Sequence, residues 1–308
     1  MGKFNKILLT GINGQVGRAL YPKLQSLGEV IAPDRSQLDL SKPKQIREVV
    51  QHIKPDLIIN PAAYTAVDKA EEEIEIAYAV NALAPATFAE EAHKLDILLV
   101  HYSTDYVFDG MGTRPYHETD TPNPLNVYGS TKLAGENAIR TVDGHYLIFR
   151  TSWVYSTGRK NFMHTVLRLA SEQEQLHIVS DQQGSPTSCL TIAEATLSAI
   201  QQWTSDKSGI YNLTNAGSTT WHGFAKAIVH EYNQLRIEKN WPPLKVQSES
   251  IQAIMAGEYP TLAQRPKNSC LDNQKLHTNF EIFPEAWPLA LAKVISMLPD
   301  HHKSLSVS

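Results

Sequence analysis

The stretch Ile7-Leu8-Leu9-Thr10-Gly11-Ile12-Asn13-Gly14-Gln15-Val16-Gly17 indicates how the fold begins. Its first four residues are typical of a short, mainly apolar strand, and a helix-like pattern starts at Arg18. Gly11 allows a tight exit from the strand, Gly14 keeps the backbone open to a phosphate, and Gly17 lets the helix lie close to the sheet. Free N–H groups at the helix N-terminus favour an anion there. Taken alone, this spacing is equally typical of an ordinary strand-to-helix turn.

Further along the chain, short apolar runs alternate with segments of helical length. The runs lie at 30–32, 57–59, 97–100 and 146–149. This alternation predicts an α/β fold with a Rossmann-type, doubly wound parallel sheet and a smaller C-terminal α/β substrate lobe. We expect residues 1–155 to form a dinucleotide-binding domain, rejoined by parts of 176–220. Residues 156–308 are expected to be mainly the substrate lobe, because their pattern is less regular and rich in turns.

Composition excludes several classes of protein. The chain has 308 residues, 42% of them hydrophobic, and a net charge of −4, which suits a sizeable core in one or two domains. It has no block of Lys and Arg that would bind nucleic acid, and no apolar stretch that would span a membrane. A cytoplasmic location is therefore predicted. Cys189 and Cys270 lie far apart in the sequence and are expected to be reduced thiols.

A second pattern, Tyr128-Gly-Ser-Thr-Lys132, places two functional side chains on one face of a predicted helix. A nearby ammonium favours the phenolate form of a tyrosine, so Lys132 is expected to tune Tyr128 as a proton donor. Ser103-Thr104-Asp105 follows an apolar strand, and Thr104 is a candidate for holding a substrate carbonyl. Each pattern has a simpler alternative: a Tyr/Lys pair on a solvated helix face, and ordinary turn chemistry after a strand.

Longer strings of the sequence resemble a known family. They are Asn-Pro-Ala-Ala-Tyr-Thr-Ala-Val-Asp-Lys-Ala-Glu at 60–71, His-Tyr-Ser-Thr-Asp-Tyr-Val-Phe at 101–108, Pro-Leu-Asn-Val-Tyr-Gly-Ser-Thr-Lys at 124–132 and Phe-Arg-Thr-Ser-Trp-Val-Tyr at 149–155. With these strings the chain resembles the extended short-chain dehydrogenases/reductases, and within them the dTDP-4-dehydrorhamnose reductases. The resemblance implies NADPH- or NADH-dependent reduction of the C4 keto group of dTDP-4-dehydro-L-rhamnose to dTDP-L-rhamnose.

The resemblance also implies roles for individual residues. Thr104, Tyr128 and Lys132 match the catalytic triad. The substrate positions are Thr104, Asp105, Tyr128, Trp153 and Arg265, although Trp153 would also suit an interior and Arg265 a surface. The cofactor positions are Gly11, Asn13, Gly14, Gln15, Val16, Gly17, Asp34, Arg35, Asp39, Leu40, Ala62, Ala63, Tyr64, Thr65, Tyr128 and Lys132.

Some features stay open at the level of sequence. Asp34 favours the ribose 2'-hydroxyl of NADH, whereas Arg35 favours the 2'-phosphate of NADPH, so the two residues give opposite indications. Pro61 departs from the usual alanine of the family and is expected only to stiffen its loop. The resemblance allows Mg²⁺ and a homodimer, but no metal ligands can be assigned, and His301-His302 are expected to belong to a solvated tail.

Two other classes of function fit the same motifs. One is a non-catalytic, NADP-binding regulatory subunit like the partner of methionine adenosyltransferase, which keeps this fold. The other is a nucleotide-sugar epimerase or dehydratase, which would retain its nicotinamide and recycle it. The intact triad and the complete 149–155 string favour the reductase.

Overall fold

A computed structural model describes residues 3–158 and 160–300 of the chain. Its centre is a sheet of six parallel strands, in the order β2-β1-β3-β4-β5-β10. The strands are β1 (Lys6–Leu9), β2 (Glu29–Ile31), β3 (Leu57–Asn60), β4 (Leu98–Thr104), β5 (Tyr146–Thr151) and β10 (Gly209–Asn212). Because β2 and β3 lie on opposite sides of β1, the topological switch falls between β1 and β3, where such sheets bind ligands.

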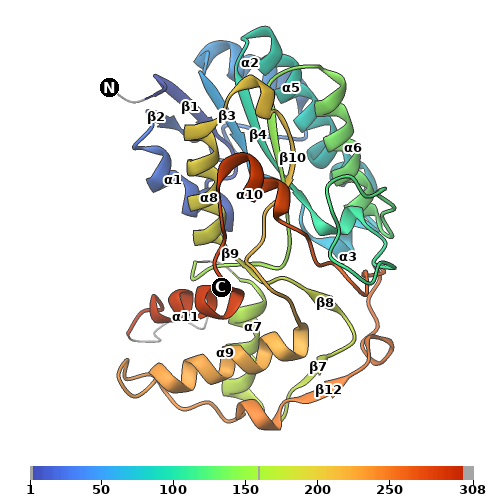
Figure 1. Cartoon of the computed structure of the whole chain (residues 1–308), viewed down its shortest axis with the longest axis vertical. Coiled ribbons are helices and arrows are strands. Elements are labelled where there is room, and N and C mark those ends of the chain that lie inside the picture. The colour runs from blue at the N-terminus through green and yellow to red at the C-terminus, as the bar shows by residue number, and fades with distance from the viewer. Residues whose placement is uncertain (1–2, 159, 301–308) are drawn as a thin grey trace.

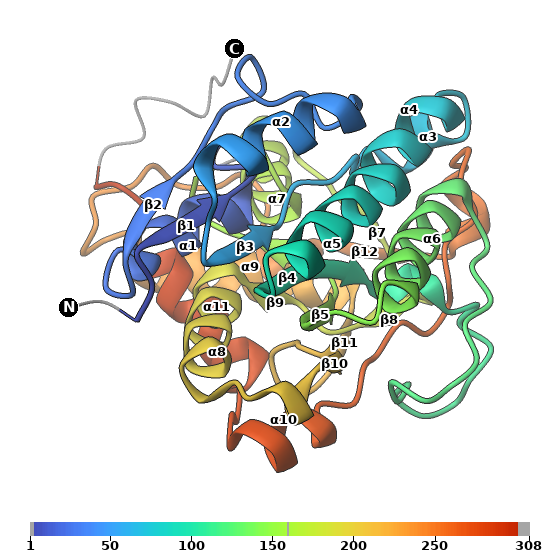
Figure 2. The same cartoon turned by 90° about the horizontal axis from the view of Figure 1, so that it is seen from above.

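Helices cover both faces of this sheet, as Figure 2 shows from above. One face carries α1 (Gln15–Leu24) and α8 (Cys189–Gln202), and the other carries α2 (Pro43–Ile53), α5 (Ala84–Lys94) and α6 (Val127–Thr141). Side chains alternate accordingly: Ile7 and Leu9 pack in the first core, and Leu8 packs in the second. The predicted α/β fold with a doubly wound parallel sheet is confirmed.

Short helical elements follow β3 and β4 at the carboxyl edge of the sheet. Between β3 and α5 the chain forms α3 (Val67–Ala70), α4 (Ile74–Tyr78) and a π-helical segment, η1 (Ala79–Leu83). A turn of 3-10 helix, η2 (Asp105–Val107), follows β4. The helix α6 begins at Val127, one residue after Asn126, whose Oδ1 accepts a hydrogen bond from the Gly129 amide at 2.7 Å.

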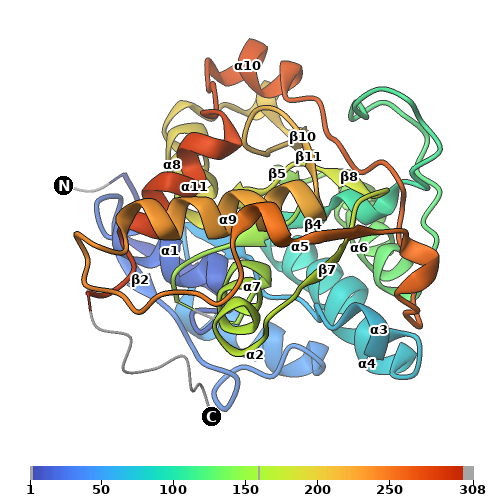
Figure 3. The ribbon, with the colours of Figure 1, turned by 90° about the horizontal axis from the view of Figure 1, so that it is seen from below.

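A second lobe lies beyond the carboxyl ends of the strands (Figure 1). Its core is formed by α7 (Phe162–Glu172), α9 (Trp221–Leu235) and α11 (Trp287–Ser296). Three small sheets join β6 (Val154–Tyr155) to β9 (Thr187–Ser188), β7 (His177–Val179) to β12 (Gln252–Ile254), and β8 (Gln183–Gly184) to β11 (Thr219–Thr220). Two 3-10 turns of this lobe are η4 (Ser248–Ser250) and η5 (Ala256–Glu258), whereas η3 (Ser205–Lys207) leads into β10 of the main sheet. In Figure 3, the view from below shows α9 and α7 of this lobe in front.

The chain crosses between the lobes more than once. After β9 it returns through α8 to β10, which pairs with β5 in the main sheet. It then enters the second lobe at α9 and returns again as α10 (Gln274–Phe280), whose Leu276 and Phe280 pack in the core beneath the main sheet. The return of α10 was not predicted, because a seven-residue helix carries little sequence pattern.

Two remaining expectations concern the chain as a whole. Cys189 and Cys270 are both buried free thiols. Within the described residues, no helix combines the length and apolar character that crossing a membrane requires. The pair His301-His302 lies outside the described residues.

Candidate active site

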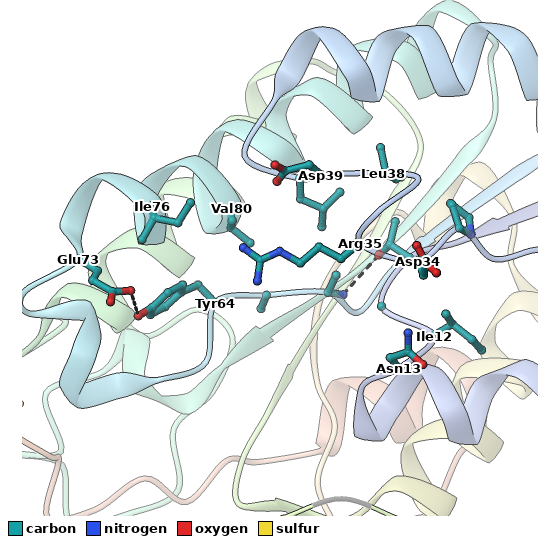
Figure 4. A pocket seen from close by; sticks show the side chains of 16 residues that line it. Ile12, Asn13, Asp34, Arg35, Leu38, Asp39, Tyr64, Glu73, Ile76 and Val80 are labelled. Atoms are coloured by element: carbon teal, nitrogen blue, oxygen red, sulfur yellow. Dashed lines mark hydrogen bonds between the residues drawn. The ribbon is translucent and has the colours of Figure 1, made fainter. Parts of the chain in front are cut away.

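Two connected hollows lie at the carboxyl edge of the sheet. The first, of about 340 Å³, is lined by the ends of β1 and β2 and the loop after β3 (Figure 4). The second, of about 800 Å³, extends from the glycine-rich turn to the second lobe. Both include Gly11 and Asn13, so they form one continuous cleft. Every predicted cofactor and substrate residue except Arg265 lines one or both of them.

The glycine-rich turn fits a pyrophosphate. Gly11 has a φ of +60°, a conformation that residues with a Cβ rarely adopt. A Cβ on Gly17 would lie 2.2 Å from the Gly11 carbonyl oxygen, so only glycine allows α1 to lie this close to the turn. Gly14 caps α1 without a side-chain hydrogen bond, which leaves the first N–H groups of the helix available to an anion.

The loop after β3 is held by a residue that sequence reasoning missed. Asn81 lies in the π-helical segment η1; its Oδ1 accepts from the Tyr64 amide at 2.8 Å, and its Nδ2 donates to the Tyr64 carbonyl at 3.1 Å. The Tyr64 hydroxyl donates to Glu73 at 2.5 Å, as drawn in Figure 4. Asn81 therefore fixes the backbone of the loop that lines the cleft. The signal for it, a buried polar residue in a helix that π-geometry widens, appears only in three dimensions.

The candidate proton donor, Tyr128, lies at the start of α6 beside the end of β4. Burial raises the pKa of Tyr128 to about 12, against the opposing effect of a hydrogen bond with Thr104, and the charge of Asp105 raises it further. This differs from the lowering expected from Lys132 alone, because loss of hydration disfavours the phenolate more than any neighbour favours it. Tyr128 therefore carries its proton at neutral pH, as an acid must.

Thr104 and Asp105 face the same cleft from the end of β4. The Thr104 hydroxyl donates to Asp105 Oδ1 at 2.9 Å. Burial raises the pKa of Asp105 to about 7. Among the described residues, Asp105 Oδ2, Ser103 Oγ and Thr151 Oγ1 are buried without a hydrogen-bond partner. All three residues line the cleft, where polar groups of a ligand can pair with these atoms.

Lys132, one helical turn after Tyr128, is almost fully buried. Its Nζ donates to the Tyr102 carbonyl at 2.6 Å and lies 3.3 Å from His101 Nε2. Burial lowers the pKa of Lys132 to about 8, while the charge of Glu136 acts in the opposite direction. Lys132 is therefore an ammonium at neutral pH with one N–H still free for a ligand.

Trp153 lies at the boundary of the two lobes. Its φ of +46° is unusual for a non-glycine residue. The indole stacks on Trp221, with ring centroids 3.5 Å apart and an interplanar angle of 8°. A Cβ on Gly184 would lie 2.4 Å from Trp153 Cε2, so glycine there leaves room for the ring. Trp221, which the sequence did not single out, lines the cleft with Trp153.

The sequence also matches a family model over most of its length. The model for the RmlD substrate binding domain matches residues 5–299. Two relatives, both dTDP-4-dehydrorhamnose reductases, come from Burkholderia thailandensis and Escherichia coli K12. The first is 44% identical and covers 93% of this chain and 96% of its own; the second is 42% identical and covers 95% and 97%.

The chain belongs to the dTDP-4-dehydrorhamnose reductase family.

Solved structures agree with this membership. A dTDP-4-dehydrorhamnose reductase from Clostridium acetobutylicum is 35% identical and superposes with a TM-score of 0.87 over 95% of this chain and 99% of its own. That of Bacillus anthracis, solved in complex with NADP, is 33% identical with the same TM-score of 0.87 over 96% and 99%. A UDP-glucose 4-epimerase from Thermus thermophilus, 16% identical with a TM-score of 0.74, shares the fold.

Two predicted site residues of this family member, Arg265 and Gln15, have side chains that already bind other parts of the protein. Arg265 forms an ion pair with Asp68, with 2.8 Å between Nη2 and Oδ2, and does not line the cleft. Gln15 Oε1 accepts from Ser156 and Asn161, both at 2.9 Å, so this side chain holds the crossing into the second lobe. Its backbone still lies at the N-terminus of α1.

Within residues 3–158 and 160–300, no group of three or more His, Cys, Asp or Glu side chains lies close enough together to hold a metal ion.

Proposed function

We propose that this protein reduces the C4 keto group of dTDP-4-dehydro-L-rhamnose to dTDP-L-rhamnose with NADPH or NADH. The observation that carries the proposal is the meeting of a protonated Tyr128, the Thr104 hydroxyl and the Lys132 ammonium in one cleft beside the glycine-rich turn. The names of the relatives support the choice of substrate. The buried, unpartnered oxygens of Asp105 and Thr151 suit the hydroxyl groups of a sugar.

Each side chain has a part in the reaction. When bound, the reduced nicotinamide supplies the hydride that C4 receives. When the sugar binds, the Thr104 hydroxyl turns from Asp105 and donates a hydrogen bond to the keto oxygen, and Tyr128 gives its proton to that oxygen as the C4–H bond forms. Lys132 holds a ribose hydroxyl of the cofactor and stabilises the phenolate that Tyr128 leaves behind. The flat face of Trp153 packs against the deoxysugar.

We also propose that the protein prefers NADPH to NADH. Asp34 Oδ1 accepts from the Ser36 amide at 2.8 Å, the Ser36 hydroxyl at 2.6 Å and the Gln37 amide at 3.2 Å, so this carboxylate holds its own turn together. The Arg35 side chain instead extends into the hollow (Figure 4) and forms no hydrogen bond or ion pair with another described residue. A free guanidinium in this position suits the 2'-phosphate of NADPH.

Replacing Arg35 should reverse this preference. In Arg35→Gln we expect kcat/KM for NADPH to fall about 10- to 100-fold, the usual loss for one charge-assisted contact, with little change for NADH. Asp34→Asn is the matched control and should affect both cofactors alike, because Asp34 acts on the turn. Initial rates with each cofactor give the ratio. Selective loss of NADH activity in Asp34→Asn would contradict the proposal.

The experiment that tests the main proposal follows the loss of nicotinamide absorbance with the keto sugar made in situ from dTDP-glucose. Wild-type protein should form dTDP-L-rhamnose in a one-to-one ratio with oxidised cofactor. Tyr128→Phe should bind cofactor normally and lose about 100-fold or more in kcat, because general acid catalysis contributes on that scale. A wild-type protein that binds NADPH but does not consume it would favour the regulatory-subunit alternative.

The same assay distinguishes the reductase from the remaining alternative, a nucleotide-sugar epimerase or dehydratase. An epimerase or dehydratase would retain bound nicotinamide cofactor through purification and would not consume added cofactor. We further propose that residues 1–155 with part of 176–220 bind the cofactor and that the rest of the chain mainly binds the nucleotide sugar. A role for Mg²⁺, the homodimer and the cytoplasmic location stay predictions.

A further inference from the structure

A chain of buried polar side chains runs from Lys132 to the glycine-rich turn. Lys132 Nζ lies 3.3 Å from His101 Nε2, and His101 Nδ1 lies 3.2 Å from Asn60 Nδ2. The Thr10 hydroxyl lies 2.6 Å from the oxygen end of the Asn60 amide and accepts from the Ala62 amide at 3.4 Å. The exposed fractions of His101 and Asn60 are both 0%. The chain joins five segments of the site: α6, β4, the end of β3, the loop after β3 and the residue that follows β1.

Burial determines the state of the His101 imidazole. It lowers the pKa of His101 well below the usual value, and the nearby Lys132 charge acts in the same direction. A neutral imidazole has one N–H donor and one acceptor nitrogen. Lys132 as an ammonium has no lone pair to offer, so Nε2 must be the acceptor. The hydrogen then lies on Nδ1. The Asn60 Nδ2 that lies 3.2 Å from Nδ1 is also a donor, so this tautomer requires the Asn60 amide to be turned, with Oδ1 accepting from Nδ1–H and Nδ2 donating to the Thr10 hydroxyl.

His101 thus takes up one of the three Lys132 donors. The Tyr102 carbonyl, 2.6 Å away, takes a second. With two donors occupied on the β4 side, the third N–H is left to point into the cleft. The titratable groups that interact with Lys132 in the described structure are His101 on β4 and Glu136 on α6 itself.

We propose that His101 is a positioning residue for the reduction: its Nε2 accepts a hydrogen bond from Lys132 and, with the Tyr102 carbonyl, directs the remaining N–H of the ammonium at the cofactor. The proposal rests on the proposed function, and it adds a residue outside the triad. Because Asn60 and Thr10 connect His101 to the glycine-rich turn, the position of Lys132 is tied to the segment that binds the pyrophosphate.

Two substitutions separate the contacts of the two ring nitrogens. Gln at position 101 can place its amide near the position of Nε2, whereas Asn reaches only the position of Nδ1. We expect His101→Asn to lose about tenfold or more in kcat, as for a lost hydrogen bond to a charged group, and His101→Gln to recover most of this loss. The KM of the sugar should change by less than about threefold in both, because the contact acts on Lys132.

The pH profile is a readout that a purely structural role would not change. Loss of an acceptor disfavours a buried ammonium, so the alkaline limb of kcat/KM should move about one pH unit lower in His101→Asn and stay in place in His101→Gln. The proposal would be overturned if the two variants had the same kcat and the same alkaline limb of the kcat/KM profile, whether both are active or both are impaired. Thermal unfolding of the two proteins checks that both are folded.

A second readout needs neither cofactor nor turnover. In cofactor-free protein labelled with ¹⁵N-histidine, the His101 signals, identified by their loss in His101→Gln, should show an unprotonated, hydrogen-bonded Nε2 and a protonated Nδ1 near neutral pH. Lys132→Met should shift the Nε2 signal and leave Nδ1 nearly unchanged. A protonated Nε2 would overturn the proposal. An inactive wild-type protein with the expected spectrum would contradict the proposed function alone.

Discussion

Lys132 combines a charge with a buried position, and burial determines the pH at which the charge is lost. The lowered pKa, about 8, means that the side chain is an ammonium below that pH and a neutral amine above it. In the proposed mechanism, a neutral amine would no longer stabilise the Tyr128 phenolate that proton transfer forms. Of these two side chains only Lys132 changes its charge near pH 8, because the pKa of Tyr128 is far higher, at about 12.

Activity should therefore decline on the alkaline side. We expect kcat/KM for the keto sugar to fall above about pH 8, approaching tenfold per pH unit, since with NADPH saturating this parameter follows the enzyme–NADPH complex, in which Lys132 is still buried. Rates measured across the pH range with saturating NADPH test the prediction. Asp105→Asn is the control, because the pKa of Asp105, raised to about 7, would otherwise add a second limb. An unchanged rate up to about pH 10 would contradict it.

At the scale of elements, α6 is held against the sheet by a buried ion pair. Glu136, one turn after Lys132, accepts from Arg150 Nε at 2.9 Å and from Arg150 Nη2 at 2.6 Å. Both side chains are about 2% exposed or less, and the guanidinium also lies over the Phe108 ring, 5.1 Å from its centroid. The pair connects α6 to β5 and so fixes where Tyr128 and Lys132 lie along the direction of the strands.

Breaking this pair should be costly. In Glu136→Gln we expect a loss of about 3–5 kcal/mol in the free energy of unfolding, because Arg150 would remain as a buried, unpaired charge. The double variant Glu136→Leu/Arg150→Met should recover most of this loss, since it removes both charges together. Urea unfolding followed by tryptophan fluorescence measures the difference. A single variant as stable as wild type would mean that water reaches Arg150.

At the scale of the whole molecule, the two lobes meet where Trp153 stacks on Trp221. Trp153 follows β5 of the main sheet, Trp221 begins α9 of the second lobe, and Gly184 of β8 lies against the indole. These residues come from distant parts of the chain, so the end of the cleft that is proposed to bind the sugar forms only when both lobes are folded. The glycine-rich turn is built within the first lobe alone.

A substitution at this junction should weaken the binding of the sugar and leave the binding of the cofactor unchanged. In Gly184→Ala the added Cβ would meet Trp153 Cε2 at 2.4 Å and displace the ring. We expect the KM of the sugar to rise about tenfold, on the scale of a lost aromatic contact, while the Kd of NADPH stays within twofold. Gly257→Ala is the control, because nothing lies within 4 Å of that position. Equal effects on both ligands would contradict the separation.

The amino-acid sequence by itself determined the features that depend on local pattern. Alternating apolar runs predict a parallel sheet, and the 7–17 stretch predicts its first strand, turn and helix. Tyr128 and Lys132 share a helix face because residues four apart always do, and Thr104 reaches the cleft because the carboxyl ends of parallel strands lie at one edge. Such relations hold wherever the segments occur, so they can be predicted without the rest of the molecule.

Only the tertiary structure decided what each of these side chains meets. The pKa of Tyr128 is raised because neighbouring segments of the folded chain take away part of its hydration, and Lys132 contacts His101 because α6 packs on β4. Arg265 pairs with Asp68, almost two hundred residues earlier in the chain, while its role in substrate binding stays a prediction. Hydration, charge pairing and stacking depend on which distant segments come together, and no local pattern carries that information.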